Sequence, residues 1–577
     1  MEGAFGVCFV FSDQPDLLIG ARRGSPLLVG VGDGEYFLAS DASAILEHTK
    51  TVEYLNESEM VVISRVGYVI SSLDAATPVS REHVLHRLEM SLEAIEKGGY
   101  KHFMLKEIME QPVAIANAMR GRVNVETGDV RLGGLMGEPL ARLSRARRII
   151  IAACGTSFHS GLVGEYLIES LARIPVEVEY ASEFRYRKVR ARAVAWGGWG
   201  VHRALSLRVA WRGACKAGSG GVVARRTAPS LGCRECSAGL QASACAAPPP
   251  VHPLPPPSSA TPSPQPILFP DDVLVVISQS GETADTLAAV REAKAHNVMT
   301  LGIVNTVGSS IARETDAGAY LHVGPEIGVA STKAFTGQVL LLTMMALMIG
   351  KEKGLIDAPT MRRYVDALAA IPSQMQSVLS QAGAIENMAR SYRYAQSFLY
   401  LGRGYNFPVA LEGALKLKEI SYIHAEGYAA AEMKHGPIAL IDRFMPVVII
   451  APKSDNTYDK IRSNIEEVSA RGGSIIVVTE DGNHELDAKA EAVLFTPHTE
   501  EFLSPLLTVV PLQLLSYHIA TLRKLDVDQV SSLPGLHTSA PARVRRSLDE
   551  CLRTAVDLAH LTHTFNLVRS HATSPSR

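Results

Sequence analysis

Two short polar segments in this sequence carry residue types that bind phosphate groups. Each follows an apolar run and precedes a helical pattern; the first holds Cys154, Gly155, Thr156 and Ser157, and the second holds Ser278, Gln279, Ser280 and Thr283. Where a strand turns into a helix, free backbone N–H groups and the positive end of the helix dipole attract an anion. Glycine lets the backbone approach closely, while hydroxyls donate hydrogen bonds. An ordinary helix cap explains either segment equally well, but two in one domain favour a phosphate site.

A third polar loop, from Gly324 to Phe335, leads into an apolar helical pattern. It places Val329, Ser331 and Lys333 shortly before or at the start of that helix. From residue types alone, a capped helix with a solvated lysine explains this loop as well as a ligand site does.

The residues best suited to acid–base chemistry lie on a predicted helix from 410 to 424. Glu412, Lys416 and Glu419 are four and seven residues apart, which places them on one helix face. Isomerising a ketose to an aldose requires a base that moves a proton between adjacent carbons and an acid that opens the sugar ring. A carboxylate and a histidine such as His435, in the loop before Gly436, suit these two tasks. Residue types alone favour the alternative of a surface salt bridge and an ordinary loop histidine.

The elements that must position these residues alternate between strands and helices. Continuous apolar runs predict strands at 148–153, 273–277 and 300–304 and, in a second round, at 397–401, 446–451 and 474–479. Such βα repetition predicts parallel sheets covered by helices, in two similar lobes that arose by internal duplication. Because ligands bind beyond the carboxyl ends of parallel strands, both phosphate-type segments are expected to face one crevice.

The N-terminal residues follow a different pattern. Segments 36–40 and 60–64 alternate apolar and polar residues, which predicts antiparallel strands over residues 1 to about 75. From His86 the spacing becomes helical, and Pro112 marks a helix boundary.

Residues 188–270 interrupt the βα alternation. They contain all three tryptophans, four of the seven cysteines and a proline-rich run at 246–257. This composition predicts a disordered loop, and a translated intron or faulty gene model explains it better than an evolved insertion. Chance explains its isolated Cys233 and Cys236 pair better than zinc does, so no metal site is predicted.

Composition excludes several classes of protein. A chain of 577 residues predicts several domains, and a net charge of −2 argues against a nucleic-acid partner. The start lacks the basic flank and apolar stretch of a secretory signal. The longest apolar run, Val339–Ile349, is shorter than the roughly 20 residues that span a bilayer, so we expect a buried helix and no membrane partner. The odd number of cysteines predicts a reducing compartment, which is the cytoplasm.

Taken together, the motifs resemble the glutamine:fructose-6-phosphate amidotransferase (isomerizing) family. They are Cys154–Ser157, Ser278–Thr283, Val329–Phe335, Ala410–Glu426 and Lys434–Pro437. Single motifs are shared with other sugar-isomerase (SIS) domains, whereas the long 410–426 motif and its order after the others are more specific. The match runs from about residue 3 to Gln529, with a gap at 188–270.

The resemblance implies an α/β fold with two SIS domains, each a parallel sheet flanked by helices, after a β-rich remnant of a glutaminase domain. The implied division is 1–75 for the remnant, 76–125 for a helical linker, 126–365 for the first SIS domain with 188–270 inserted, 380–529 for the second and 530–577 for a divergent tail.

The resemblance also implies a site for fructose 6-phosphate or glucose 6-phosphate, with no cofactor. Thr156, Ser157, Ser278, Gln279, Ser280 and Thr283 would hold the phosphosugar, beside Cys154 and Gly155, with Val329 and Ser331 lining the site. Glu419 would be the base that moves the proton, and Glu412 and Lys416 would complete the site. His435 would assist ring opening from a neighbouring subunit, which implies a homodimer. The product would be glucosamine 6-phosphate for UDP-N-acetylglucosamine biosynthesis.

Two departures from the family pattern limit this expectation. The family's glutaminase uses an N-terminal cysteine, whereas this chain starts Met1-Glu2 and its first cysteine, Cys8, falls where the family has an interior strand of that domain, so no glutamine hydrolysis is expected. The family's tail carries a lysine that forms an imine with the sugar, whereas residues 530–577 predict only a helix, with a possible capping box at 547–550. Two alternatives remain, a non-catalytic phosphosugar-binding module and a different SIS isomerase, and the 1–75 remnant argues against the latter.

Overall fold

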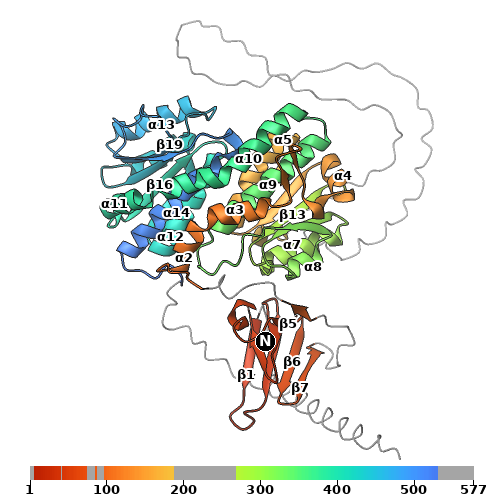
Figure 1. The fold of residues 1–577 in the computed structure, drawn as a ribbon. Coiled ribbons are helices and arrows are strands. Elements are labelled where there is room, and N and C mark those ends of the chain that lie inside the picture. Colours follow the sequence, from red (N-terminus) through yellow and green to blue (C-terminus); the bar gives the residue numbers. More distant parts are fainter. Residues whose placement is uncertain (1–4, 41, 74–84, 88–95, 188–267, 530–577) are drawn as a thin grey trace, which may run out of the picture. The chain divides into compact units, whose positions relative to one another are not determined.

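The computed structural model describes residues 5–40, 42–73, 85–87, 96–187 and 268–529 (Figure 1). The predicted loop at 188–270, apart from its last three residues, lies outside the described residues. The predicted helix after residue 530 also lies outside them.

The N-terminal region is built from two antiparallel sheets, as the alternating pattern predicts. One has the order β1 (Phe5–Val10), β2 (Leu18–Arg23), β6 (Glu59–Ser64), β7 (Gly67–Ser72), and the other β4 (Tyr36–Ala39), β3 (Leu28–Val31), β5 (Thr51–Tyr54), β8 (His86–Arg87). The helical pattern expected from His86 onward is wrong at the two residues described there. His86 and Arg87 instead pair with Val52 and Thr51 of β5 in an antiparallel sheet. Pairing with a distant strand therefore decides the structure here, against the helical spacing of the apolar residues.

Helices α2 (Phe103–Met109), α3 (Gln111–Met119) and α4 (Glu138–Arg145) precede the first parallel sheet. The helix boundary predicted at Pro112 is present. Glu110 separates the two helices, as the C-cap of α2 and the N-cap of α3. Pro112 lies in the first turn of α3, where its missing N–H is tolerated.

The first lobe contains a five-stranded, fully parallel sheet. Its order is β12 (Val176–Tyr180), β11 (Ile149–Ala153), β13 (Val273–Ser278), β14 (Met299–Val304), β15 (Ala317–Tyr320). The central strands are buried on both faces because helices α5 (Thr156–Ala172), α7 (Ala284–Ala295) and α9 (Lys333–Glu352) cover the sheet. The chain order reverses at β11, which lies between β12 and β13, and this makes the ends of β11 and β13 a topological switch point.

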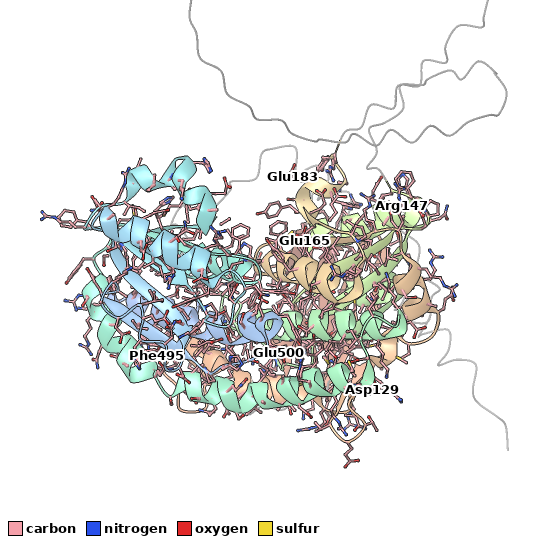
Figure 2. All side chains as sticks on the ribbon, turned by 90° about the horizontal axis from the view of Figure 1, so that it is seen from above. Asp129, Arg147, Glu165, Glu183, Phe495 and Glu500 are labelled. Atoms are coloured by element: carbon pink, nitrogen blue, oxygen red, sulfur yellow. The ribbon has the colours of Figure 1, made fainter. Side chains whose placement is uncertain are left out.

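The second lobe repeats this connectivity. Its parallel sheet has the order β17 (His424–Ala429), β16 (Ser397–Gly402), β18 (Pro446–Ile450), β19 (Ser474–Glu480), β20 (Ala492–Thr496). Its helices include α12 (Asn406–Ser421), α13 (Tyr458–Ala470) and α14 (Ser504–Leu522), while α10 (Ala358–Leu379) and α11 (Ala382–Tyr392) connect the lobes. Figure 2 labels Glu165 and Asp129 in the first lobe and Phe495 and Glu500 in the second. The predicted fold class, two α/β lobes with parallel sheets after a β-rich region, is confirmed.

Two helices, α9 and the segment Glu501–Leu522 that contains α14, are long and apolar enough to cross a membrane by length and composition. Their apolar windows are completely buried, so both are core helices. The apolar run at 339–349 therefore lies in a buried helix as predicted, although that helix is longer than the run. Residues of α5 and α9 from the first lobe and of α12 and α14 from the second share one hydrophobic core.

Candidate functional site

A cavity of about 210 Å³ lies at the switch point of the first sheet. It is lined by Cys154, Thr156, Ser157, Ile277, Ser278, Gln279, Ser280, Thr283, Val329, Ser331 and Glu419. The structure thus brings together both predicted phosphate-type segments, the third polar loop and the carboxylate of α12. Gly155 is the one predicted binding residue outside this lining. It is the N-cap of α5, with a φ of 55° that favours glycine.

The second phosphate-type segment folds into a compact turn between β13 and α7. The Gly281 N–H donates to Ser278 Oγ over 3.0 Å, and Ser278 Oγ lies 3.0 Å from Thr283 Oγ1. Gly281 has a φ of 67°, and a Cβ there would lie 2.0 Å from Ser309 Oγ. The turn therefore requires glycine at this position, both for its conformation and for space.

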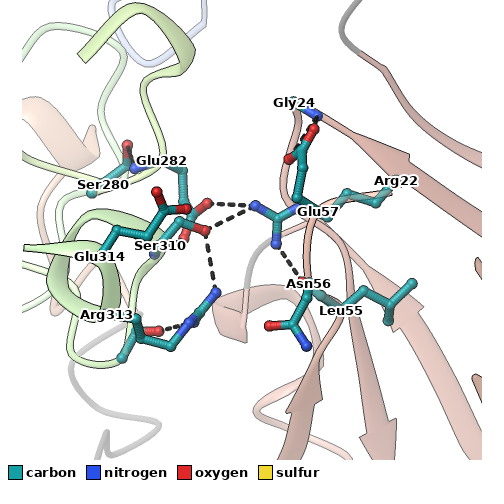
Figure 3. Close-up of polar contacts among 12 residues, drawn as sticks. Arg22, Gly24, Leu55, Asn56, Glu57, Ser280, Glu282, Ser310, Arg313 and Glu314 are labelled. Carbon is teal, nitrogen blue, oxygen red and sulfur yellow. Dashed lines mark hydrogen bonds and ion pairs between the residues drawn. The ribbon is translucent and has the colours of Figure 1, made fainter. Parts of the chain in front are cut away.

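Glu282 of the same turn is not among the cavity-lining residues, and its carboxylate contacts Ser310 and Arg22 (Figure 3). Its Oε1 accepts from the Ser310 N–H over 2.7 Å, and its Oε2 accepts from Arg22 Nη2 over 3.0 Å. Arg22 is buried and also donates to Ser310 Oγ and to the Leu55 carbonyl. These bonds anchor the turn through a residue that does not line the cavity.

Ser157, at the start of α5, is oriented by a buried amide from α9. Gln338 Nε2 donates to Ser157 Oγ over 2.9 Å, and Ser160 Oγ donates to Gln338 Oε1 over 2.9 Å. Both Gln338 and Ser160 are fully buried. No sequence pattern points to Gln338, because only folding brings α9 beside α5.

The three charged residues predicted on one helix face do lie together on α12. Lys416 Nζ is 2.8 Å from Glu419 Oε2 and 3.5 Å from Glu412 Oε1. Thr156 joins this group, because its Oγ1 donates to Glu412 Oε1 over 3.0 Å and lies 3.1 Å from Lys416 Nζ. The alternative of a surface salt bridge is wrong for Glu412 and Lys416, whose side chains are 0% and 1% exposed.

His159, which the sequence analysis missed, completes this buried cluster from α5. Its Nδ1 lies 2.7 Å from Glu412 Oε2, a hydrogen bond to the carboxylate. Glu412 thereby has partners on both oxygens, since Thr156 and Lys416 contact the other. A helical pattern around residue 159 gives no hint of a partner on α12, so sequence reasoning could not find this residue.

The cluster holds its two central groups in their charged forms. Burial alone raises the pKa of Glu412, but the charge of Lys416 and the hydrogen bonds from His159 and Thr156 outweigh it and lower this pKa below 4.5. Burial likewise lowers the pKa of Lys416, but the negative charges of Glu412 and Glu419 outweigh it and raise this pKa above 10.5. An ammonium group therefore stands beside the carboxylate that reaches the cavity.

The third polar loop is fixed by its own carboxylate. Glu326 Oε2 accepts from Ser331 Oγ over 2.7 Å, and Glu326 Oε1 accepts from the N–H groups of Thr332 and Ala334. Glu326 thus satisfies free donors at the start of α9 and orients Ser331. The alternative of a solvated lysine is wrong for Lys333, which is 3% exposed and paired with Glu110.

His435 does not join the cavity within this chain. It ends a short 3-10 helix (Ala430–His435), is exposed, and is absent from the cavity lining. Over the described ranges, no group of three or more His, Cys, Asp or Glu side chains is arranged to hold a metal ion.

Comparison with known proteins assigns this architecture to a family. The SIS domain family model matches residues 142–192, 251–348 and 391–523. A protein of Chlorobaculum tepidum named glutamine–fructose-6-phosphate aminotransferase (isomerizing) is 48% identical over 533 residues, which cover 92% of this chain and 73% of the relative. The chain belongs to the glutamine–fructose-6-phosphate aminotransferase (isomerizing) family. A family member from Bacteroides thetaiotaomicron is 45% identical over 92% of this chain and 73% of its own length.

A solved structure supports the same assignment. The C-terminal domain of glucosamine-fructose-6-phosphate aminotransferase from Francisella tularensis is 33% identical and has a TM-score of 0.59, covering 75% of this chain and 100% of that chain. Because relatives named as aminotransferases match 92% of the chain, neither alternative, the different SIS isomerase nor the non-catalytic binding module, is favoured.

Proposed function

We propose that the cavity binds fructose 6-phosphate and that the chain converts it, with ammonia, to glucosamine 6-phosphate. The observation that supports this most strongly is that Glu419 lines the same cavity as the two phosphate-type turns. This shared lining supports Glu419 as the base that acts on a phosphorylated sugar.

The phosphate is assigned to the hydroxyls and N–H groups around Thr156, Ser157 and Ser278–Thr283. Two turns that follow neighbouring parallel strands supply hydroxyl and backbone N–H donors. Val329 and Ser331 also line the cavity and are assigned to contacts with the sugar carbons and hydroxyls.

The reaction proposed is balanced as fructose 6-phosphate plus ammonia giving glucosamine 6-phosphate plus water. Ammonia replaces the C2 carbonyl oxygen, which leaves as water, and forms a C2 imine. Glu419 then takes a proton from C1 and returns it to C2, while the proton of the C1 hydroxyl passes to the imine nitrogen; C1 becomes the aldehyde and C2 carries the amine. Lys416 and Glu412 act on Glu419 through the buried cluster and are positioning residues in this scheme.

We further propose a homodimer in which a second copy supplies His435 for ring opening. In its own chain His435 is exposed and away from the cavity lining, so a neighbouring subunit is the arrangement that would bring it to a sugar. The cytoplasm is the compartment proposed, since both cysteines among the described residues, Cys8 and Cys154, are free thiols. The product would enter the synthesis of UDP-N-acetylglucosamine.

The β-rich region of residues 5–72 is proposed to be part of a glutaminase domain. Its two antiparallel sheets, within a match that covers 92% of this chain, support this assignment. The division at about 75, 125, 365 and 380 into remnant, linker and two SIS domains is likewise a proposal.

The test is to supply the purified chain with fructose 6-phosphate and ammonium and to measure glucosamine 6-phosphate. We expect product, and we expect glucose 6-phosphate, but not unphosphorylated glucose, to raise the melting temperature. Stabilisation without product would support a non-catalytic phosphosugar-binding module. If the chain forms no product and is not stabilised by millimolar ligand, the proposed site is contradicted.

A further inference from the structure

The α2 helix contacts the third polar loop through one buried carboxyl group. Glu107 Oε1 accepts hydrogen bonds from the N–H groups of Ile327, over 2.5 Å, and Gly328, over 3.2 Å. Glu107 is 2% exposed, although it comes from a segment far from the loop in sequence. The next residue, Val329, lines the cavity, and Ser331 lines it two residues later.

The second oxygen of Glu107 is in an unusual position. Its Oε2 is buried without a hydrogen-bond partner and lies where a Cβ at Gly328 would meet it at 2.8 Å. A charged carboxylate with an unpartnered oxygen is costly to bury, whereas a neutral carboxyl costs much less. Glycine at 328 permits the close approach of loop and carboxyl.

The charged groups that face Glu107 come from the loop and from α9. Burial and the negative charge of Glu326 raise the pKa of Glu107 to about 8, against the hydrogen bonds from Ile327 and Gly328 and the positive charge of Lys333. The ammonium of Lys333 is shared with Glu110, 2.8 Å away, so it does not fully neutralise Glu107.

The loop has a second anchor beside the first. The Val329 N–H donates to the Asp528 carbonyl over 3.3 Å, and the Asp528 carboxylate accepts from the N–H groups of Phe103 and Met104 at the start of α2. The α2 helix therefore holds the loop directly through Glu107 and indirectly through Asp528. Nothing in the proposed reaction uses either contact.

We infer that Glu107 is a positioning residue of the phosphosugar site, which fixes the backbone at Ile327 and Gly328 so that Val329 and Ser331 face the ligand. The inference rests on the proposed function, because the ligand is the one proposed above. In the observed arrangement the loop backbone covers the carboxyl, which is 2% exposed. Because Oε2 is buried without a partner, ionisation of Glu107 destabilises this arrangement of loop and carboxyl, and ligand affinity falls as pH rises toward about 8.

The experiment compares Glu107→Ala, Glu107→Gln and Glu110→Gln with the wild-type chain. Glu110→Gln is the matched control. Glu110 is three residues after Glu107, and its carboxylate contacts Lys333 but accepts no hydrogen bond from the loop backbone. Two quantities are measured: the dissociation constant for glucose 6-phosphate between pH 7 and 9, and amide hydrogen exchange at residues 327–329.

For Glu107→Ala we expect faster amide hydrogen exchange at residues 327–329 and at least about tenfold weaker binding of glucose 6-phosphate. The melting temperature should not change. For Glu107→Gln, whose amide oxygen still accepts from the loop, we expect wild-type affinity at pH 7 and no weakening toward pH 9. The wild type should weaken over that range, and Glu110→Gln should weaken less, because Lys333 is then free to stabilise the ionised form of Glu107.

Wild-type exchange at 327–329 in Glu107→Ala would overturn the inference without any ligand. The inference would also be overturned if the wild-type chain binds glucose 6-phosphate and the dissociation constant of Glu107→Gln depends on pH in the same way. Should Glu107→Ala not fold, the Glu107→Gln profile decides. A wild-type chain that binds no phosphosugar would instead overturn the proposed function, even with the exchange result intact.

Discussion

At the scale of single residues, the site depends on a buried charge cluster with more carboxylates than ammonium groups. Glu412 and Lys416 are inaccessible to solvent, yet Glu412 has partners on both carboxylate oxygens. A buried charge is tolerated only when it is paired and hydrogen-bonded. Each member of this cluster is therefore needed by the others, and removing one leaves an uncompensated group.

His159 is expected to stabilise the fold through Glu412. The His159→Ala variant removes one donor from a buried carboxylate and should lower the free energy of unfolding by about 1–3 kcal/mol. His484→Ala is the control, because His484 pairs with Asp487 at the exposed surface, where such pairs contribute little. Urea denaturation measures both, and equal small effects would contradict the assigned role of His159.

Glu412 is expected to make stability depend on acid pH. Its pKa is lower in the folded chain than 4.5, so its contribution is fully present above pH 4.5 and is lost as pH falls through the lowered value. Glu412→Gln should cost roughly 3–5 kcal/mol at pH 7, because Lys416 loses a buried partner. The difference from wild type should shrink below pH 4.5, as measured by denaturant midpoints. A difference that does not depend on pH would contradict this account.

At the scale of elements, two strand-to-helix turns create the cavity. Both follow buried parallel strands that are neighbours in the sheet, with Ala153 of β11 paired to Ile277 of β13. This pairing places the residues after each strand at one edge. The geometry of the turns then depends on backbone conformation, most strictly at Gly281.

Gly281→Ala is expected to weaken phosphosugar binding by about tenfold or more. The variant combines a strained φ of 67° with a clash at Ser309, and the turn can relieve both only by moving. Gly354→Ala is the matched control, because its φ of 68° is similar but open space surrounds its Cβ position. Calorimetric titration with glucose 6-phosphate measures both variants. Equal affinity in the two would show that turn geometry does not control binding.

Much of this arrangement was predictable from sequence, and the reason is local. The apolar runs at 273–277 and 446–451 predicted strands, because continuous apolar residues are typical of buried strands. The four- and seven-residue spacing predicted that the charged residues of α12 share one helix face. His159, Gln338 and Glu107 were missed because their partners lie on other elements. The strand at His86 was missed for the same reason, since its pairing partner β5 is distant in sequence.

At the scale of the whole molecule, the two lobes share one hydrophobic core, and the site uses both. Turns come from the first lobe and Glu419 from α12 of the second, so the cavity exists only while the lobes stay packed. The core between them includes residues of α9 and of α14. We therefore expect the two lobes to unfold together.

Leu514→Ala on α14 tests this cooperativity. Leu514 is fully buried in the shared core, and its truncation should cost about 2–5 kcal/mol while preserving a single unfolding transition. Leu355→Ala is the control, because half of that side chain is exposed and little packing is lost. Hydrogen exchange in β11 and β18 should accelerate together in Leu514→Ala. Acceleration in β18 alone would contradict a common core.

The Glu419→Gln variant tests most directly whether Glu419 is the base. It is assayed with fructose 6-phosphate and ammonium. The control is Glu386→Gln, which alters an exposed carboxylate paired with Arg390. We predict that Glu419→Gln forms glucosamine 6-phosphate at least about a hundredfold more slowly than wild type and still binds glucose 6-phosphate, while Glu386→Gln matches wild type. Wild-type turnover by Glu419→Gln would contradict the role of this carboxylate as the base.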